Sequence, residues 1–160
     1  MTRLIAAAIL ALGLLGFPNM GSYTKGIGQK KYLRKIEASA VLETLTIYNP
    51  VASQCDATPW ITASNARIDP MKLSKQQLRW MALSRDLMKR WNGKFNYGDT
   101  VLVSSGDKQI DGYWVIQDIL NKKYKMRGDL LFDRAVRKTG RWNQVTITRS
   151  VMISADSTAI

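Results

Sequence analysis

The sequence contains no histidine, a single cysteine and only two glutamates among its 160 residues. The absence of histidine excludes a Ser-His-Asp triad, a histidine general base and a histidine-ligated metal site. The lone Cys55 can form neither a disulfide within the chain nor a cysteine-cluster zinc site, so it is either a buried inert thiol or a reactive one. Acid–base chemistry is left to aspartate, tyrosine, lysine and the two glutamates, and we expect neither a metal nor a cofactor.

Negative charge is scarce as well. The chain has 24 lysines and arginines against 12 aspartates and glutamates, a formal net charge of +12. This balance favours a polyanionic partner, which can be nucleic acid, an anionic membrane or an anionic cell-wall polymer, although it also fits a basic protein that is merely soluble. A hydrophobic content of 46% predicts a packed globule rather than disorder, and the length suits one domain.

The N-terminus has the pattern of an export signal. Arg3 precedes fourteen apolar or glycine residues, Leu4 to Phe17, and Pro18 ends the run. A transmembrane helix needs about 20 such residues. We therefore predict a signal peptide or membrane anchor over residues 1–22, with membrane attachment through residues 4–17 if it is retained. A buried N-terminal helix is the alternative. Export predicts a periplasmic or secreted protein associated with the cell envelope.

The rest of the chain divides by composition into a basic linker at 23–40, a folded domain at 41–151 and a tail at 152–160. Short segments rich in β-formers alternate with Gly, Asn and Asp turns, and they predict strands at 42–48, 61–64, 100–103, 110–117, 129–132 and 144–151. Residues 74–91 have helical spacing, but they also fit a strand at 80–84 followed by a short helix that starts near Ser84. This pattern predicts a mainly β fold, a small barrel with one or two short helices.

Two aspartates, Asp118 and Asp129, stand eleven residues apart on either side of a strongly cationic loop. An apolar run precedes the first, Tyr113 to Ile116, and another follows the second, Leu130 to Phe132. Carboxylates at strand ends beside a basic loop can bind a polar polymer that is anionic or glycan-like. The structural alternative is that Asp129 caps a turn or pairs with a neighbouring cation.

Four stretches of this sequence resemble the three-aspartate domain, a double-psi β-barrel found in membrane-bound lytic transglycosylase A and, more distantly, in rare lipoprotein A and the expansins. The stretches are Thr46-Ile47-Tyr48-Asn49-Pro50, Ile61-Thr62-Ala63-Ser64-Asn65, Met81-Ala82-Leu83-Ser84 with Tyr97-Gly98-Asp99-Thr100-Val101, and the segment from Asp118 to Asp129. Together they cover roughly residues 42–148. The resemblance implies a six-stranded double-psi barrel and lytic cleavage of the β-1,4 glycosidic bond of murein, with Asp129 as the general acid and base and peptidoglycan glycan strands as the partner.

The same resemblance implies roles for residues around the two aspartates. Hydroxyls can bind sugar hydroxyls, aromatic rings can stack on sugar rings, and cations can bind the carboxylates of the muramyl lactyl group or the peptide. The candidates are Thr62 and Ser64 for hydroxyl contacts, Trp60, Tyr113 and Trp114 for stacking, and Lys123, Lys125 and Arg127 for carboxylates. A raised pKa of Asp129 would follow from its apolar flank and from the like charge of Asp118.

The sequence also departs from the family pattern. Ser84 stands where the family has its first aspartate, with Asp86 two residues further on, and Ile119-Leu120-Asn121 replaces Thr-Gly-Gly after Asp118. The family's second domain, which forms the other wall of its cleft, has no counterpart here. These departures favour a non-catalytic peptidoglycan-binding barrel as the alternative. A basic nucleic-acid-binding protein using the 121–141 cations is a third hypothesis, against which the export signal argues. Bacteria and bacteriophages both make cell-wall proteins of this size.

Overall fold

The computed structural model describes residues 32–53, 58–137 and 139–154, which form six strands and three short helices. The strands are β1 (Tyr32–Tyr48), β2 (Trp80–Leu83), β3 (Thr100–Ser104), β4 (Gly112–Ile119), β5 (Arg127–Leu131) and β6 (Arg141–Ser154). The helices are α1 (Pro70–Ser74) and the 3₁₀ turns η1 (Arg85–Leu87) and η2 (Lys89–Trp91). The predicted export segment at 1–22, Cys55 and the end of the tail lie outside the described residues.

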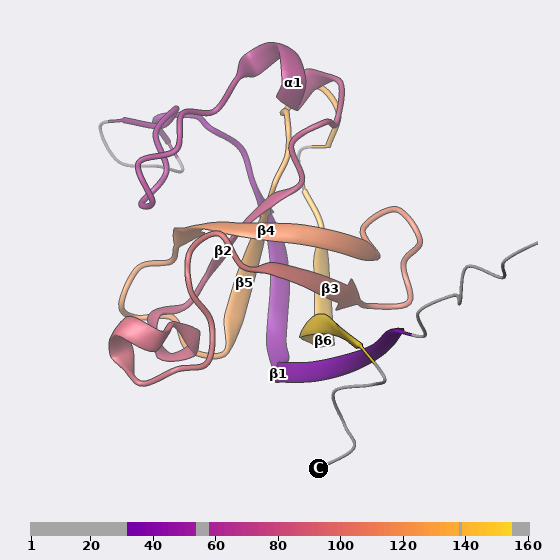
Figure 1. Cartoon of the computed structure of the whole chain (residues 1–160). Helices are drawn as coiled ribbons and strands as arrows, with labels where there is room; N and C mark the ends of the chain where they lie inside the picture. The colour runs from indigo at the N-terminus through magenta and orange to yellow at the C-terminus, as the bar shows by residue number, and fades with distance from the viewer. Residues whose placement is uncertain (1–31, 54–57, 138, 155–160) are drawn as a thin grey trace, which may run out of the picture. The chain divides into compact units, whose positions relative to one another are not determined.

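The six strands make one sheet that closes on itself in the order β1-β5-β2-β4-β3-β6 (Figure 1). The pairs β1–β5 and β2–β4 are parallel, and the other four pairs are antiparallel. The expectation of a mainly β fold with short helices is therefore confirmed. Alternate side chains of each strand point into the ring, as the two-residue period of a strand requires. These inward side chains form the main core, which includes Leu42, Met81, Val101, Trp114, Ile116, Leu130 and Ile147.

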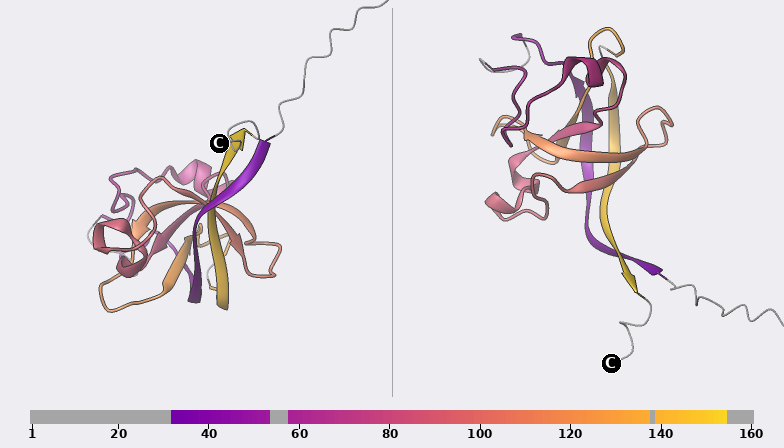
Figure 2. Two further views of the ribbon diagram at one scale, coloured as in Figure 1. Left: turned by 60° about the horizontal axis from the view of Figure 1, so that its bottom comes forward. Right: turned by 45° about the horizontal axis from the view of Figure 1, so that its top comes forward.

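β1 and β6 are far longer than the other strands and continue beyond the ring as a two-stranded ribbon (Figures 1 and 2). Their pairing runs from Tyr32 opposite Ser154 to Thr46 opposite Arg141. The strand thus begins nine residues before Val41, inside the segment 23–40 that the sequence predicted as a linker. Hydrophobic alternation could not reveal the start of this strand, because residues 33–37 are all exposed and have no buried side.

Three local segments bear on the secondary structure expected from the sequence. For residues 74–91 the second alternative is confirmed, since β2 is followed by the 3₁₀ turns η1 and η2. The strand expected at 61–64 is wrong, because these residues make only an isolated bridge between Ile61 and Arg67. Helix α1 is an addition to the expected elements: the carboxylate of Asp69 accepts hydrogen bonds from the backbone N–H groups of Met71 and Lys72, and Pro70 occupies the first helical turn.

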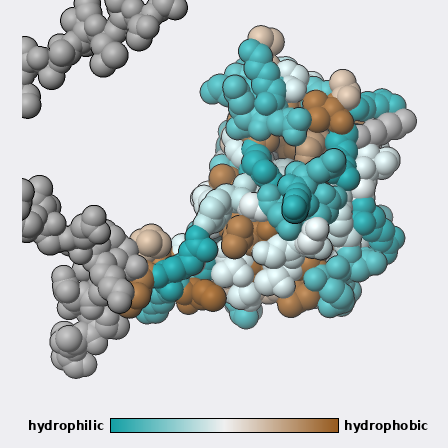
Figure 3. Space-filling view, turned by 90° about the vertical axis from the view of Figure 1, so that its right-hand side faces the viewer, coloured by the Kyte–Doolittle hydropathy of each residue, from teal (hydrophilic) through white to brown (hydrophobic). Residues whose placement is uncertain are grey.

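The face in Figure 3 is mostly hydrophilic, and its hydrophobic areas are small and separate from one another. Such a surface agrees with the charged composition. Among the helices of the described ranges, none has the length and apolar character needed to span a bilayer.

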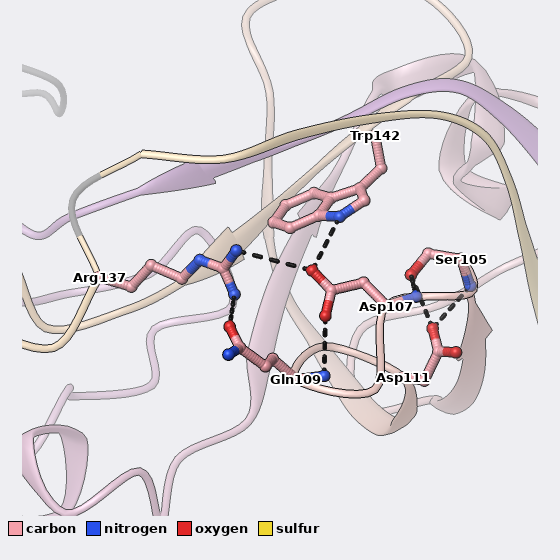
Figure 4. A network of polar contacts seen from close by, with 6 residues as sticks. All are labelled: Ser105, Asp107, Gln109, Asp111, Arg137 and Trp142. Atoms are coloured by element: carbon pink, nitrogen blue, oxygen red, sulfur yellow. Dashed lines mark hydrogen bonds and ion pairs between the residues drawn. The ribbon is translucent and has the colours of Figure 1, made fainter.

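A polar network fixes the β3–β4 connection (Figure 4). The carboxylate of Asp111 accepts hydrogen bonds from Ser105 N at 2.6 Å, Ser105 Oγ at 2.7 Å and Gly106 N at 3.1 Å. In the same loop the carboxylate of Asp107 accepts from Trp142 Nε1 of β6 at 3.1 Å. The loop is thereby joined to the strand that closes the ring. Burial acts to raise the pKa of Asp111, but the hydrogen bonds from Ser105 and Gly106 and the charge of Arg79 lower it overall.

Because a carboxyl with a lowered folded-state pKa stabilises the fold only when ionised, Asp111 should stabilise above its unfolded pKa of about 3.9 and lose this effect as the pH falls through its folded value. We expect Asp111→Ala to lower the free energy of unfolding by about 0.5–1.5 kcal/mol at pH 7, because three hydrogen bonds are lost at a site where solvent screens the charge. Urea unfolding should show the difference shrinking toward pH 2, whereas Lys108→Ala, an exposed change in the same loop, should have little effect. A loss that is independent of pH would contradict this role.

Candidate functional site

The two aspartates lie on either side of the same small residue. Asp129 of β5 and Asp118 of β4 are both in register with Ala82 of β2, the strand between them. Neighbouring strands are about 4.8 Å apart, so the two Cα atoms are separated by roughly 10 Å. The methyl group of Ala82 leaves a hollow between the carboxylates. On the far side of Asp129, Thr46 of β1 continues the row.

A β-bulge puts Asp118 into this row. Along the β2–β4 pair, Met81 is opposite Ile116, but the next residue, Ala82, is opposite Asp118, so Gln117 is the extra residue of β4. Without the bulge, Gln117 would occupy the position beside Ala82. Ser64 holds the bulge by donating from its backbone N–H to Gln117 O at 3.1 Å and from its hydroxyl to Gln117 Oε1 at 2.5 Å. Bulges commonly redirect a side chain next to a functional site.

Asp118 is held by a set of donors. Its Oδ1 atom accepts from the backbone N–H groups of Ala63 at 3.0 Å and Ile119 at 2.9 Å, and its Oδ2 atom accepts from the Tyr48 hydroxyl at 3.4 Å. An ionised carboxylate is an acceptor only, and three donors match that state. Asp118 is thus oriented as a fixed negative charge at one end of the row.

Asp129 has the opposite character. Burial raises its pKa above the ordinary value for aspartate; the hydrogen bond donated by Thr46 Oγ1 and the charge of Arg127 oppose the rise, and the charge of Asp118 adds to it. The net direction is upward, as the apolar flank and the second carboxylate led us to expect. A carboxylate that accepts several hydrogen bonds beside a second carboxyl with a raised pKa resembles the arrangement by which proteins separate acid and base roles.

This raised pKa gives a prediction about stability. A carboxyl whose pKa is higher in the folded state adds stability below its unfolded pKa and loses that contribution as the pH rises through the folded value. We therefore expect Asp129→Asn, which removes the titration, to be more stable than the parent at pH 7 by about 0.5–2 kcal/mol, as is common when a functional-site strain is relieved. Thermal unfolding followed by circular dichroism should show this gain disappear below about pH 4. A variant that is less stable than the parent at pH 7 would contradict the assignment.

A cleft of about 920 Å³ opens over the row, within the range of ligand sites. Both aspartates and Ala82 line it, and apolar side chains such as Ile47 and Leu120 form part of its walls. Its other polar groups come from loops and strand ends: Tyr48, Thr58, Thr62, Asn65, Arg85, Asn121 and Tyr124. A mixed lining of this kind, with carboxylates at the floor, suits a ligand that has many hydroxyls and some apolar surface.

The cleft contains only part of the predicted site. Asp118, Asp129 and Thr62 line it, and Thr62 shares a 3.0 Å hydrogen bond with Ser64, which therefore supports the cleft from behind. Trp60 and Tyr113 are absent from the lining within the described ranges. Tyr113 instead lies beside Arg34 of the β1–β6 ribbon, whose guanidinium donates to its hydroxyl.

The predicted cations occupy the rim rather than the floor. Lys123 Nζ and Arg127 Cζ lie 5.0 and 5.2 Å from the ring centre of Tyr124, which itself lines the cleft. Lys125 is exposed. Within the described residues these three side chains are outside the lining of the cleft, but Arg127 lies two residues before Asp129 in β5, and its charge acts to lower the pKa of Asp129. Trp114, the remaining stacking candidate, is buried in the core.

Sequence reasoning missed Tyr48, Arg85, Asn121 and Tyr124 as cleft residues. Tyr48 was quoted as part of a strand motif, and the sequence contains no sign that its hydroxyl reaches Asp118 in β4. Arg85 follows β2 and belongs to residues 74–91, for which the sequence allowed two secondary structures. Their positions depend on which strands are neighbours in the ring, and a single sequence does not specify this.

No known family model matches the chain, and no curated protein sequence matches it significantly. Across the residues that the structure describes, no group of three or more Asp, Glu or Cys side chains is arranged to hold a metal ion.

Proposed function

We propose that the chain is an exported, cell-envelope-associated protein that acts on peptidoglycan, cleaving its β-1,4 glycosidic bond in the manner of a lytic transglycosylase. The observation that carries the proposal is the pair across Ala82: Asp129 with a raised pKa beside the hydrogen-bonded carboxylate of Asp118, both in one cleft. A carboxyl with a raised pKa is suited to donate a proton near neutral pH.

In the proposed reaction, protonated Asp129 donates its proton to the glycosidic oxygen as the bond from that oxygen to C1 breaks. The resulting carboxylate then accepts the proton of the 6-hydroxyl group, whose oxygen bonds to C1 and closes the 1,6-anhydro ring. The proton returned to Asp129 restores the starting state, and no water is consumed. One acid/base carboxyl is sufficient, unlike the pair that hydrolytic glycosidases need. The charge of the neighbouring Asp118 carboxylate acts to raise the pKa of Asp129 and so favours its protonated form.

We further propose that the closed six-stranded ring is a double-psi β-barrel of the three-aspartate type. Its support is the combination of two parallel and four antiparallel pairs in a six-stranded ring, together with the place of Asp118 and Asp129 on the strands that flank β2. The proposed partner is the glycan strand of peptidoglycan and not nucleic acid, because two carboxylates on the cleft floor would repel a continuous polyanion.

A second candidate is a peptidoglycan-binding module without catalysis. Ser84, at the position of the family's first aspartate, is fully buried and is used structurally, because its Oγ atom accepts from Arg127 N at 3.0 Å and its N–H donates to Arg127 O. The bulky Leu120 and Asn121 line the cleft where the family has its two glycines. These features favour binding over turnover.

The test is incubation of the protein with purified peptidoglycan and mass spectrometry of the soluble products. Anhydromuropeptides are expected. Products with reducing ends would mean hydrolysis and would overturn the proposed mechanism. Absence of products, with protein that still sediments with the cell wall, would favour the binding module.

A further inference from the structure

Arg85 is the one cation that lines the cleft, judged over the residues that the structure describes. It is the first residue of η1 and is separated from the end of β2 only by Ser84, so its backbone is close to Ala82, beside which Asp118 and Asp129 lie. The lysines and arginines of the 121–127 loop, by contrast, are outside the lining. A single positive charge in a site with two carboxylates calls for an explanation.

The charge of Arg85 is not neutralised by the described part of the protein. The ion pairs found there belong to Arg137 and Arg149. The adjacent carboxylate of Asp86 accepts from Met126 N instead. The Nε atom of Arg85 is buried and has no hydrogen-bond acceptor. Among the described residues, no hydrogen bond or ion pair engages the two Nη groups of Arg85 either, so acceptors that a ligand brings into the cleft can pair with these groups.

Stacking holds the guanidinium without using its donors. Arg85 Cζ lies 5.3 Å from the ring centre of Trp91, a distance at which the cation is attracted to the face of the ring. A guanidinium restrained in this way keeps its N–H groups available in a fixed plane. That plane matches the two oxygens of a carboxylate, which arginine binds through two parallel hydrogen bonds.

We propose that Arg85 forms a subsite for a carboxylate carried by the glycan, while uncharged sugar rings occupy the region of Asp118 and Asp129. This inference rests on the proposed function and names a specificity determinant within the same cleft. In peptidoglycan the carboxylate has two sources. One is the lactyl group of a muramyl residue that has no stem peptide, and the other is the stem peptide itself.

The experiment compares three ligands by isothermal titration calorimetry: chitohexaose, which is neutral, glycan strands freed of peptides, and strands that carry stem peptides. All proteins carry Asp129→Asn so that no ligand is cleaved. Arg85→Gln should weaken binding of the carboxylate-bearing strands at least about tenfold and leave chitohexaose binding unchanged. Arg85→Lys, which keeps the charge and loses the planar fork, should give a smaller loss.

The matched control is Arg90→Gln. Arg90 Cζ also lies over the Trp91 ring, at 5.4 Å, but Arg90 is exposed and outside the lining, so all three affinities should persist. A loss restricted to peptide-free strands would identify the lactyl carboxylate, and a loss restricted to peptide-bearing strands would identify the stem peptide.

Equal weakening of chitohexaose binding, or no weakening at all in Arg85→Gln and Arg85→Lys, would overturn the subsite and leave the proposed function standing. Failure of the reference protein to bind any of the three glycans would overturn the function and the subsite together. Should Arg85→Gln not fold, two other measurements decide. They are the titrations of Arg85→Lys and the salt dependence of binding by the reference protein, which carries Asp129→Asn alone. Binding of the charged strands should weaken with added salt more than binding of chitohexaose.

Discussion

Asp129→Asn is expected to slow the release of anhydromuropeptides from peptidoglycan by about 10²–10⁴-fold, the usual contribution of a positioned general acid and base. The asparagine side chain is nearly isosteric and can still accept the hydrogen bond that Thr46 donates to Asp129. It cannot protonate the glycosidic oxygen or accept a proton afterwards. Since this change is also expected to stabilise the fold at pH 7, unfolding would not account for the lost activity.

The measurement is the initial rate of soluble product release, quantified by mass spectrometry, with sedimentation on peptidoglycan as the check on binding. Asp69→Asn is the matched control, because Asp69 caps α1 outside the cleft and asparagine caps helices equally well. Asp69→Asn should keep the parental rate. Binding should persist in Asp129→Asn. A variant at Asp129 that retains the parental rate would remove Asp129 from the mechanism.

The secondary structure was predictable where one face of an element is buried and the other is not. The strand at 100–104 shows this most clearly, since Val101 and Val103 point inward and alternate with more exposed neighbours. The start of β1 was not predictable, because its partner β6 lies more than a hundred residues away and residues 33–37 are all exposed. Local patterns record burial, and they do not record pairing between distant segments.

In the candidate site, too, local features were predictable from the sequence and features that depend on strand pairing were not. The two aspartates were identifiable from the change between apolar and charged residues at 115–132, and the structure brings both to one cleft. Their common register with Ala82 depends on the bulge at Gln117 and on β2 lying between β4 and β5. Neither feature has a signature in the sequence. Arg85 and Tyr48 joined the site only through this topology, and Tyr113, which is close to Asp118 in sequence, faces Arg34 of the ribbon instead.

The second large effect is expected from Trp114→Ala, which should lower the free energy of unfolding by about 3–5 kcal/mol. Trp114 is 2% exposed, its ring centre lies 5.6 Å from that of Phe132, and its Nε1 atom donates to Ile110 O at 2.7 Å. Its ring also supports the guanidinium of Arg79, whose Cζ atom is 4.4 Å from the ring centre. Removing the indole leaves a cavity in the core, takes away one of the two hydrogen bonds that Ile110 O accepts, and leaves the partly buried guanidinium of Arg79 without its aromatic platform. A domain of this size has a total stability of about 5–15 kcal/mol, so the loss is a large share.

Urea unfolding followed by far-ultraviolet circular dichroism measures this loss, with Trp60→Ala as the control. Trp60 is 40% exposed, lies in a loop and is outside the cleft lining, so its replacement should cost no more than about 1 kcal/mol. Trp114→Phe should restore much of the stability, because a phenyl ring refills most of the cavity and still offers Arg79 an aromatic face. Both tryptophans were sugar-stacking candidates by sequence, and the experiment separates the two roles. A Trp114→Ala protein that stays as stable as the parent but no longer binds glycan would reverse the assignment, because loss of binding without loss of stability would place Trp114 at the ligand and not in the core.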